Sequence, residues 1–160
     1  MMTIEVLKTQ LAVLADRIAA LETVEQPEAE WPKDGDTYFF IDGDGDVLNS
    51  QWDSDLRDTS RMNIGNVFRT VAEAEHEIDR RKVLTTLRRL ARESWGKTKI
   101  DWENAYQAKW EIYYCRQEQV WDVTSDGWST PLSIYFYTAA CAEDAIRTIG
   151  AERLMLLLED

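Results

Sequence analysis

The chain has 160 residues and is 44% hydrophobic, 30% charged and 11% aromatic, which is typical of a globular protein. Its formal net charge of −12 argues against direct nucleic-acid binding, which needs many Lys and Arg side chains facing phosphates. No apolar run is long enough to cross a membrane, and no secretory leader is recognisable. We therefore expect a cytoplasmic protein that does not act on membranes. Its two cysteines indicate neither a disulfide framework nor a metal site.

The first segment carries an apolar heptad pattern over three heptads, with Ile or Leu at the a positions and Leu at the d positions. This favours a parallel two-stranded coiled coil, so we predict a dimerisation helix over residues 1–25. Additional Val and Ala residues widen the apolar stripe, and docking of this helix on the chain's own domain stays open. The heptad residues are Ile4, Leu7, Leu11, Leu14, Ile18 and Leu21.

Pro27 and Pro32 cannot continue this helix, and the acidic residues between them are typical of a linker. We predict a linker over residues 26–31 and a single α+β domain over residues 32–160.

The domain contains an internal repeat at an offset of 68 residues. "NVFRTVAEAEHEI" (66–78) matches "IYFYTAACAEDAI" (134–146), and each reads as a short strand that runs into a helix capped by Thr70 or Thr138. A hairpin-like stretch precedes each match. We therefore predict two tandem β-β-β-α repeats, over about 34–95 and 106–158, with helices at about 70–94 and 139–158 and antiparallel sheet covered by helices on one side.

The stretch "FIDGDGDVLNSQW" (40–52) places Asp42, Asp44 and Asp46 at the spacing of a calcium loop. Val47 stands where such a loop needs glycine, Asp53 stands where it needs glutamate, and the preceding residues are strand-like. Asp-Gly is a strong hairpin dipeptide, typically in a type I′ turn. We expect a hairpin without a metal ion, whose aspartates could meet a basic partner.

Charge is unevenly distributed along the chain. Residues 34–58 hold eight aspartates and one arginine, whereas residues 80–99 hold eight basic residues and one glutamate. The basic stretch is either a solvated helix face or a patch for an anionic ligand or an acidic partner surface. Seven tryptophans suggest core packing or an aromatic recognition site. The candidate binding residues of this edge are Arg81, Arg88, Arg89, Arg92, Trp95 and Trp102.

Catalytic residues are not evident. His76 is the single histidine and lies between two glutamates, and no histidine is visibly placed to activate Cys141. No glycine-rich phosphate loop is present. We expect a protein that is not an enzyme and uses no cofactor.

The pattern Trp31-Pro32, Gly35, Tyr38, Gly45, Val47, Trp52, Arg61, Gly65-Asn66, Phe68, Thr70 and Ala74-Glu75 resembles a widespread set of small uncharacterised phage and prophage proteins. The resemblance covers about residues 31–158 and is strongest over "IGNVFRTVAEAE". It implies an α+β module that acts in the cytoplasm of a bacterial host, but it brings no activity or catalytic residue.

The sequence therefore predicts a homodimeric phage accessory protein that binds another macromolecule. The most concrete form is an inhibitor of a bacterial defence component, in the manner of an anti-CRISPR protein, with a basic nuclease or a CRISPR effector as the partner. The alternatives are a protein that sequesters a small anionic nucleotide signal and a component of the virion or of its assembly.

Overall fold

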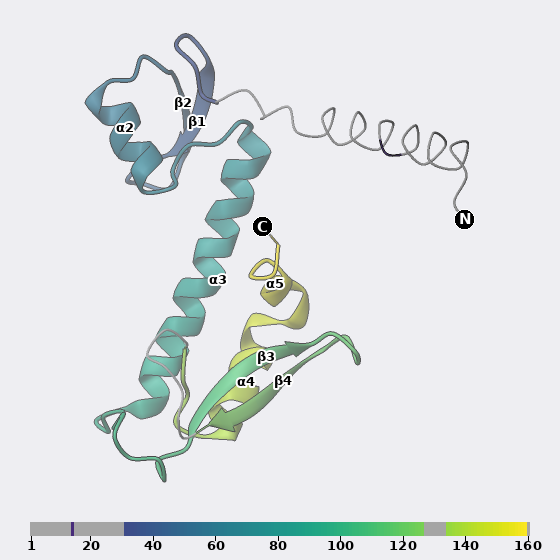
Figure 1. Ribbon diagram of the computed structural model, residues 1–160. Coiled ribbons are helices and arrows are strands. Elements are labelled where there is room, and N and C mark those ends of the chain that lie inside the picture. The colour runs from purple at the N-terminus through teal and green to yellow at the C-terminus, as the bar shows by residue number, and fades with distance from the viewer. Residues whose placement is uncertain (1–13, 15–30, 127–133, 160) are drawn as a thin grey trace, which may run out of the picture.

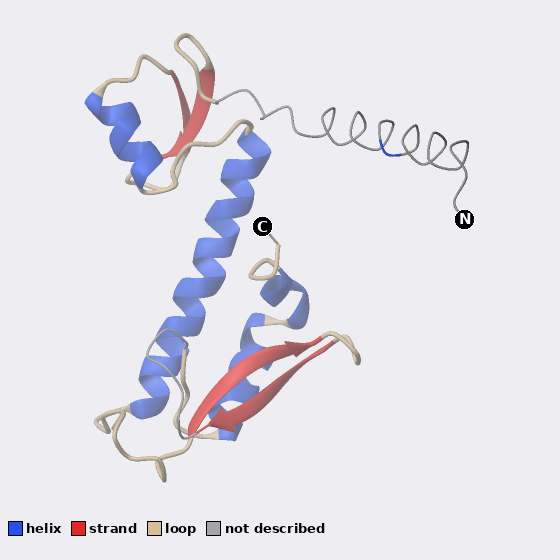
Figure 2. Ribbon diagram, in the orientation of Figure 1, coloured by secondary structure: helices blue, strands red, loops and turns tan. Residues whose placement is uncertain are grey.

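A computed structural model describes Leu14, residues 31–126 and residues 134–159. It confirms the α+β class, with two small antiparallel sheets and four helices in the described part (Figures 1 and 2). The elements are β1 Thr37–Ile41, β2 Val47–Gln51, α2 Leu56–Asn63, α3 Val71–Trp95, β3 Lys109–Cys115, β4 Val120–Asp126, α4 Ala139–Ile149 and α5 Ala151–Met155. Apart from Leu14, which is helical and exposed, the predicted dimerisation helix and linker lie outside the described residues.

The described residues form two small units joined by the 25-residue helix α3 (Figure 1). We call residues 31–70 the upper unit, which contains β1, β2 and α2 and sits on the N-terminal end of α3. We call residues 96–159 the lower unit, in which β3, β4, α4 and α5 lie beside the C-terminal half of the same helix (Figure 2). A helix of this length spans about 37 Å, so the two hairpins stand well apart.

In the upper unit, β1 pairs with β2 in an antiparallel register that places Phe40 opposite Leu48. Tyr38 and Phe40 face α2, where the guanidinium of Arg61 lies 3.5 Å from the centre of the Phe40 ring. Asn66 joins the end of the unit to β1: its side-chain oxygen accepts from the Ile41 amide (3.0 Å), and its side-chain nitrogen donates to the Ile41 carbonyl (2.8 Å).

The hairpin predicted around Asp44-Gly45 is present, but its turn is not of type I′. That type needs positive φ at both central residues, whereas φ is positive at Gly45 (90°) and not at Asp44. The Gly45 amide donates to the Asp42 carbonyl (3.3 Å) and the Asp42 amide donates to the Asp46 carbonyl (2.9 Å). The loop is therefore a three-residue connection with glycine at its left-handed position.

The predicted third strand of each repeat is reduced to a single bridge. Phe68 exchanges two backbone hydrogen bonds with Phe39, and Phe136 exchanges two with Trp110. Each bridging phenylalanine lies two residues before a threonine N-cap, and both caps accept a hydrogen bond at 3.2 Å, from the Glu73 and Cys141 amides. Segments 68 residues apart in the sequence thus have matching local geometry.

Helix α3 begins and ends within one residue of its prediction, and α4 begins where the sequence places it. The second predicted helix, however, is interrupted at Gly150, where φ is 91°, and a short helix, α5, follows. Helix α2 was not predicted. Its N-cap is Asp55, whose carboxylate accepts from the Arg57 and Asp58 amides (2.7 and 2.8 Å).

The main core lies between α3 and the lower unit, where α4 packs against α3 and covers the β3–β4 hairpin. Ala74, Val83 and Leu87 on α3 are buried. The core is made of Val83, Leu87, Ala91, Phe136, Ala142, Ala145, Ile149 and Leu154.

Asn66 gives a direct test of the upper unit. Replacing Asn66 by Ala leaves the buried N–H and C=O of Ile41 without partners, so we expect the free energy of unfolding to fall by about 2–4 kcal/mol. Urea denaturation at neutral pH measures this change. The control Asn63→Ala, at an exposed position on α2, should change the free energy by less than about 0.5 kcal/mol. Equal effects of the two substitutions would show that the Asn66 bonds contribute nothing.

Candidate functional site

A buried hydrogen-bond network fixes the upper unit. The Tyr38 hydroxyl donates to Asp58 Oδ1 (2.5 Å) and accepts from Arg61 (2.6 Å), while the Asp53 amide donates to Asp58 Oδ2 (2.8 Å). Tyr38 is fully buried and Asp58 is 3% exposed. The Trp52 ring packs edge-on against Tyr38, with ring centres 5.8 Å apart. The network therefore joins β1, the end of β2 and α2 through one carboxylate.

This environment shifts two pKa values in opposite directions. Burial disfavours the charged form of Asp58, but hydrogen bonds from Tyr38 and the Asp53 amide outweigh it and lower the pKa of the carboxyl. Burial and the bond to Asp58 raise the pKa of Tyr38. At neutral pH the aspartate is therefore charged and the tyrosine is neutral, as their hydrogen bond requires.

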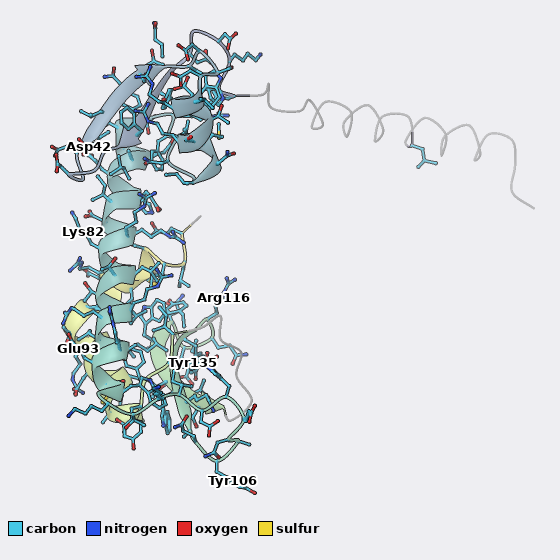
Figure 3. The ribbon with its side chains drawn as sticks, turned by 90° about the vertical axis from the view of Figure 1, so that its left-hand side faces the viewer. Asp42, Lys82, Glu93, Tyr106, Arg116 and Tyr135 are labelled. Carbon is cyan, nitrogen blue, oxygen red and sulfur yellow. The ribbon has the colours of Figure 1, made fainter. Side chains whose placement is uncertain are left out.

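At the tip of the β1–β2 hairpin (residues 37–51), which we call the acidic hairpin, Asp44 and Asp46 are exposed and Asp42 is half-buried. The Asp42 carboxylate turns back into its own loop, where Oδ1 accepts from the Asp44 and Asp46 amides (both 2.9 Å). Asp44 and Asp46 are exposed at the turn. Figure 3 shows Asp42 at the edge of the upper unit, beside the N-terminal part of α3. The loop is thus held by internal bonds while two negative charges face outward.

Three neighbouring aspartates have their own structural roles. Carboxylate oxygens of Asp53, Asp55 and Asp58 lie within 4.8 Å of one another. They accept hydrogen bonds from backbone amides at the start of α2 or just before it. These bonds account for their proximity, and the cluster is the scaffold of α2.

The predicted basic residues lie along α3, but several are paired within the helix. Arg81 bonds Glu77 (2.8 Å) and Arg89 bonds Glu93 (2.9 Å). Figure 3 shows Lys82 and Glu93 spaced along this helix. Arg81 lines a cavity of about 420 Å³ beside Gly45 of the acidic hairpin, whereas Arg88 lines another of about 290 Å³ beside Phe136. These two arginines therefore belong to different cavities, and Arg92 is exposed.

The two candidate tryptophans differ in position. Trp95 is 7% exposed, and its indole N–H donates to the Tyr135 carbonyl (2.8 Å), so it belongs to the core and cannot be a surface contact. Trp102 is 44% exposed and packs edge-on against the Tyr135 ring. Figure 3 places Tyr135 inside the lower unit and the exposed Tyr106 at its far end. Only Trp102 of this pair is available to a partner.

A fully buried lysine organises the loop that carries Trp102. The ammonium of Lys109 donates to the carbonyls of Asn104 (3.3 Å) and Gln107 (3.1 Å) and lies 5.8 Å from the Trp102 ring centre. A buried charge requires such acceptors. The loop is thus tied to the start of β3.

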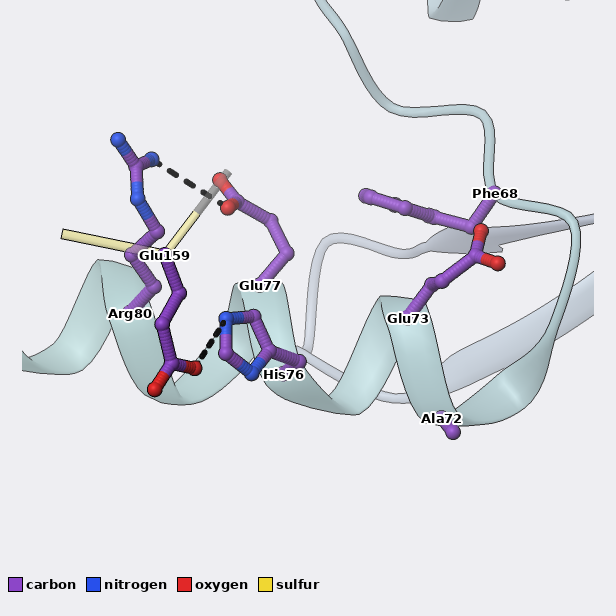
Figure 4. Close-up of a pocket in the computed structure, with 7 residues that line it drawn as sticks. All are labelled: Phe68, Ala72, Glu73, His76, Glu77, Arg80 and Glu159. Carbon is purple, nitrogen blue, oxygen red and sulfur yellow. Dashed lines mark hydrogen bonds and ion pairs between the residues drawn. The ribbon is translucent and has the colours of Figure 1, made fainter. Parts of the chain in front are cut away.

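His76 lies in an open groove of about 670 Å³ between α3 and the end of the chain (Figure 4). Its Nε2 lies 3.7 Å from a Glu159 carboxylate oxygen, and Glu77 bonds Arg80 on the same groove. Phe68 closes the other end. The described residues that line this groove include no serine, threonine or cysteine.

A second groove of about 540 Å³ lies between the β3–β4 turn and α5. Trp121 lines it and packs on Tyr114, and its indole nitrogen is the one buried side-chain nitrogen or oxygen without a hydrogen-bond partner in the described part of the chain.

No family model, curated protein or solved structure matches the chain. Among the residues described, no helix is long and apolar enough to cross a membrane.

Four residues of the sequence pattern on which the resemblance rests have structural roles in the upper unit. Tyr38 and Arg61 belong to the buried network, Asn66 bonds Ile41, and Phe68 forms the bridge to β1. Sequence reasoning missed the network because its members are spread over positions 38–61 and no local pattern connects Tyr38 to Asp58. The Asp-x-x-Asp spacing of Asp55 and Asp58 was the available signal for the start of a helix.

The network predicts a defined pH dependence of stability. Because folding lowers the pKa of Asp58, its contribution is complete above the ordinary aspartate pKa of about 4 and is lost as the pH falls below it. Because folding raises the pKa of Tyr38, its contribution is lost as the pH rises above about 10.

We expect Asp58→Asn to lower the free energy of unfolding by about 2 kcal/mol at pH 7. The difference from the wild type should narrow as the pH falls from about 5 to about 3, which urea denaturation at each pH measures. Asp79→Asn, which removes an exposed partner of Lys82, is the control and should change stability by less than about 0.5 kcal/mol. A constant difference between Asp58→Asn and wild type at all pH values would contradict the assignment.

Proposed function

We propose that the protein is a non-enzymatic binding protein whose upper unit contacts a basic surface of a macromolecular partner. The observation that carries this proposal is the exposure of Asp44 and Asp46 at the tip of a hairpin whose loop is fixed by internal hydrogen bonds. Residues 31–70 contain eight acidic and four basic residues, a net charge of −4. Complementary charge on a partner would steer association and select the orientation of binding.

The order of the upper unit supports the same proposal. Binding costs less entropy when the contacting loop is already fixed in the free protein. The Asp58 network and the Asn66 bonds connect β1, β2 and α2, so the charged tip is carried on a cross-linked base.

The resemblance to phage and prophage proteins gives the proposal its biological form. We propose that the protein acts in a bacterial host and inhibits a defence component, for which a basic nuclease or a CRISPR effector is the fitting partner. Occluding a basic nucleic-acid channel requires negative charge on a rigid protrusion, and the acidic hairpin supplies both.

We further propose that the two units derive from one β-β-β-α repeat and that the chain dimerises through its N-terminal heptads. The matching Phe68 and Phe136 bridges and the matching threonine caps support the repeat. The heptad residues, except Leu14, lie outside the described residues, and their sequence pattern alone supports the coiled coil.

The dimer prediction is tested by sedimentation equilibrium. The full chain should sediment as a dimer, and a chain that begins at Glu30 should sediment as a monomer, because the heptads are then missing. A dimer in both, or a monomer in both, would show that the heptads do not associate.

The proposed inhibition is tested by plaquing. Expression of the chain in a bacterial strain with an active CRISPR–Cas system should raise the plaquing efficiency of a targeted phage. Asp44→Asn/Asp46→Asn should reduce this protection and weaken binding to the isolated effector by about 5–30-fold, since two interface charges contribute about 1–2 kcal/mol in total.

The matched control is Glu143→Gln/Asp144→Asn, which removes two exposed charges from the lower unit. It should leave protection unchanged. Equal loss in the two double variants would point to net charge and not to the acidic hairpin. No protection by the wild type against any CRISPR–Cas type would contradict the defence proposal.

A further inference from the structure

In the described part of the chain, no strand pairs with the outer edge of β2, and the Gln51 carbonyl there accepts only from the neighbouring Ser50 hydroxyl (3.5 Å). In an antiparallel ladder, the N–H and C=O of successive residues point alternately toward the two neighbouring strands. The backbone N–H and C=O of Phe39 point toward Phe68, which lies on the side of β1 opposite to β2. The bonds that extend the ladder join Asp36 to Trp52 and Asp42 to Asp46.

This alternation fixes the direction of every backbone group in β2. The even-numbered positions Leu48 and Ser50 face β1, with which they are paired through Phe40 and Tyr38. The N–H and C=O groups of Val47, Asn49 and Gln51 therefore point away from β1. Within the part of the chain that the structure describes, β2 pairs with β1 alone, and Asn49 and Gln51 are exposed.

The strand β2 itself lacks three features that commonly prevent strand pairing at an edge. Natural edge strands are commonly blocked by proline, by lysine or by a bulge. The sequence of β2 is "VLNSQ", its five residues match β1 one to one, and it contains none of these features. Leu48 is 46% exposed on the same face as Phe40, so an added strand could cover an apolar side chain.

The charges beside this edge decide which strand it fits. Exposed Asp44 and Asp46 stand before β2, and exposed Asp53 follows shortly after it. A second copy of the chain, paired antiparallel through its own β2, would bring Asp46 of one copy toward Asp53 of the other. Like charges placed opposite each other across strands are destabilising, so pairing of two copies is disfavoured. A strand with basic residues at its two ends would instead be attracted by the aspartates at both ends of β2.

We propose that the outer edge of β2 binds an extended, basic segment of the partner protein as an additional antiparallel strand. This inference rests on the proposed function and names the chemistry of the partner at the same acidic hairpin. Main-chain bonds to Val47, Asn49 and Gln51 provide the contact, as in other cases of strand addition. The flanking aspartates select lysine or arginine at the ends of the segment.

The probe is a fluorescein-labelled peptide, Lys-Lys-Val-Thr-Val-Thr-Val-Lys-Lys, titrated with the full chain and followed by fluorescence anisotropy. We expect saturable binding. Asn49→Pro should weaken peptide binding by at least about tenfold, because proline removes one outward-facing N–H. The pairing of β2 with β1 should be preserved, since proline is tolerated where the N–H of an edge strand faces solvent. Asn49→Ala keeps the N–H and should bind within about threefold of the wild type.

A modified peptide gives the same test without changing the protein. Two peptides are made, one N-methylated at the odd-numbered amides and the other at the even-numbered amides, and both keep the charge of the parent peptide. One of the two should not bind, because its methyl groups replace the N–H donors that face β2. This arm carries the conclusion if circular dichroism shows that Asn49→Pro is unfolded. Asp44→Asn/Asp46→Asn should weaken binding by about tenfold and reduce its salt dependence.

The outcomes separate the two proposals. Loss of binding on N-methylation and in Asn49→Pro supports strand addition. If only the aspartate variant weakens binding, strand addition is overturned while the acidic contact of the proposed function stands. If the peptide does not bind the wild type, strand addition is overturned, and the plaquing experiment decides the proposed function independently.

Discussion

The upper unit depends on the buried carboxylate of Asp58. This group accepts from Tyr38 on β1 and from the Asp53 amide just after β2, and it belongs to α2 itself. A two-stranded hairpin is marginally stable alone, and the unit holds few of the large apolar side chains that build the lower core. Hydrogen bonds to the Asp58 carboxylate compensate for part of the hydrophobic packing that the upper unit lacks. The unit therefore keeps a defined structure at the end of a long helix.

The position of the charges has a consequence for function. Asp42, Asp55 and Asp58 use their carboxylates for internal bonds, whereas Asp44 and Asp46 remain exposed. The negative charge of the upper unit thus has a structural part and a part available to a partner. The exposed part lies next to the open edge of β2, which brings electrostatic attraction and main-chain recognition to one place.

The sequence predicts the elements with strong local signals. Both threonine caps, the limits of α3 and the two hairpins follow from capping, periodicity and turn residues. Features that depend on contacts between distant segments were not predicted. They are the bond of Asn66 to Ile41, the Tyr38–Asp58 pair and the buried Lys109. At the candidate site, the exposed aspartates were predicted, but the inward turn of Asp42 and the burial of Trp95 depend on tertiary packing.

Amide hydrogen exchange of the free protein, measured residue by residue by NMR, reports both the order of the upper unit and the open edge of β2. We expect slow exchange at Phe39, Ile41, Leu48 and Ser50 and fast exchange at Val47, Asn49 and Gln51. Slow exchange throughout β2 would mean that its edge is already covered. Fast exchange at Ile41 and Leu48 as well would mean that the upper unit is not the ordered support on which the binding proposals depend.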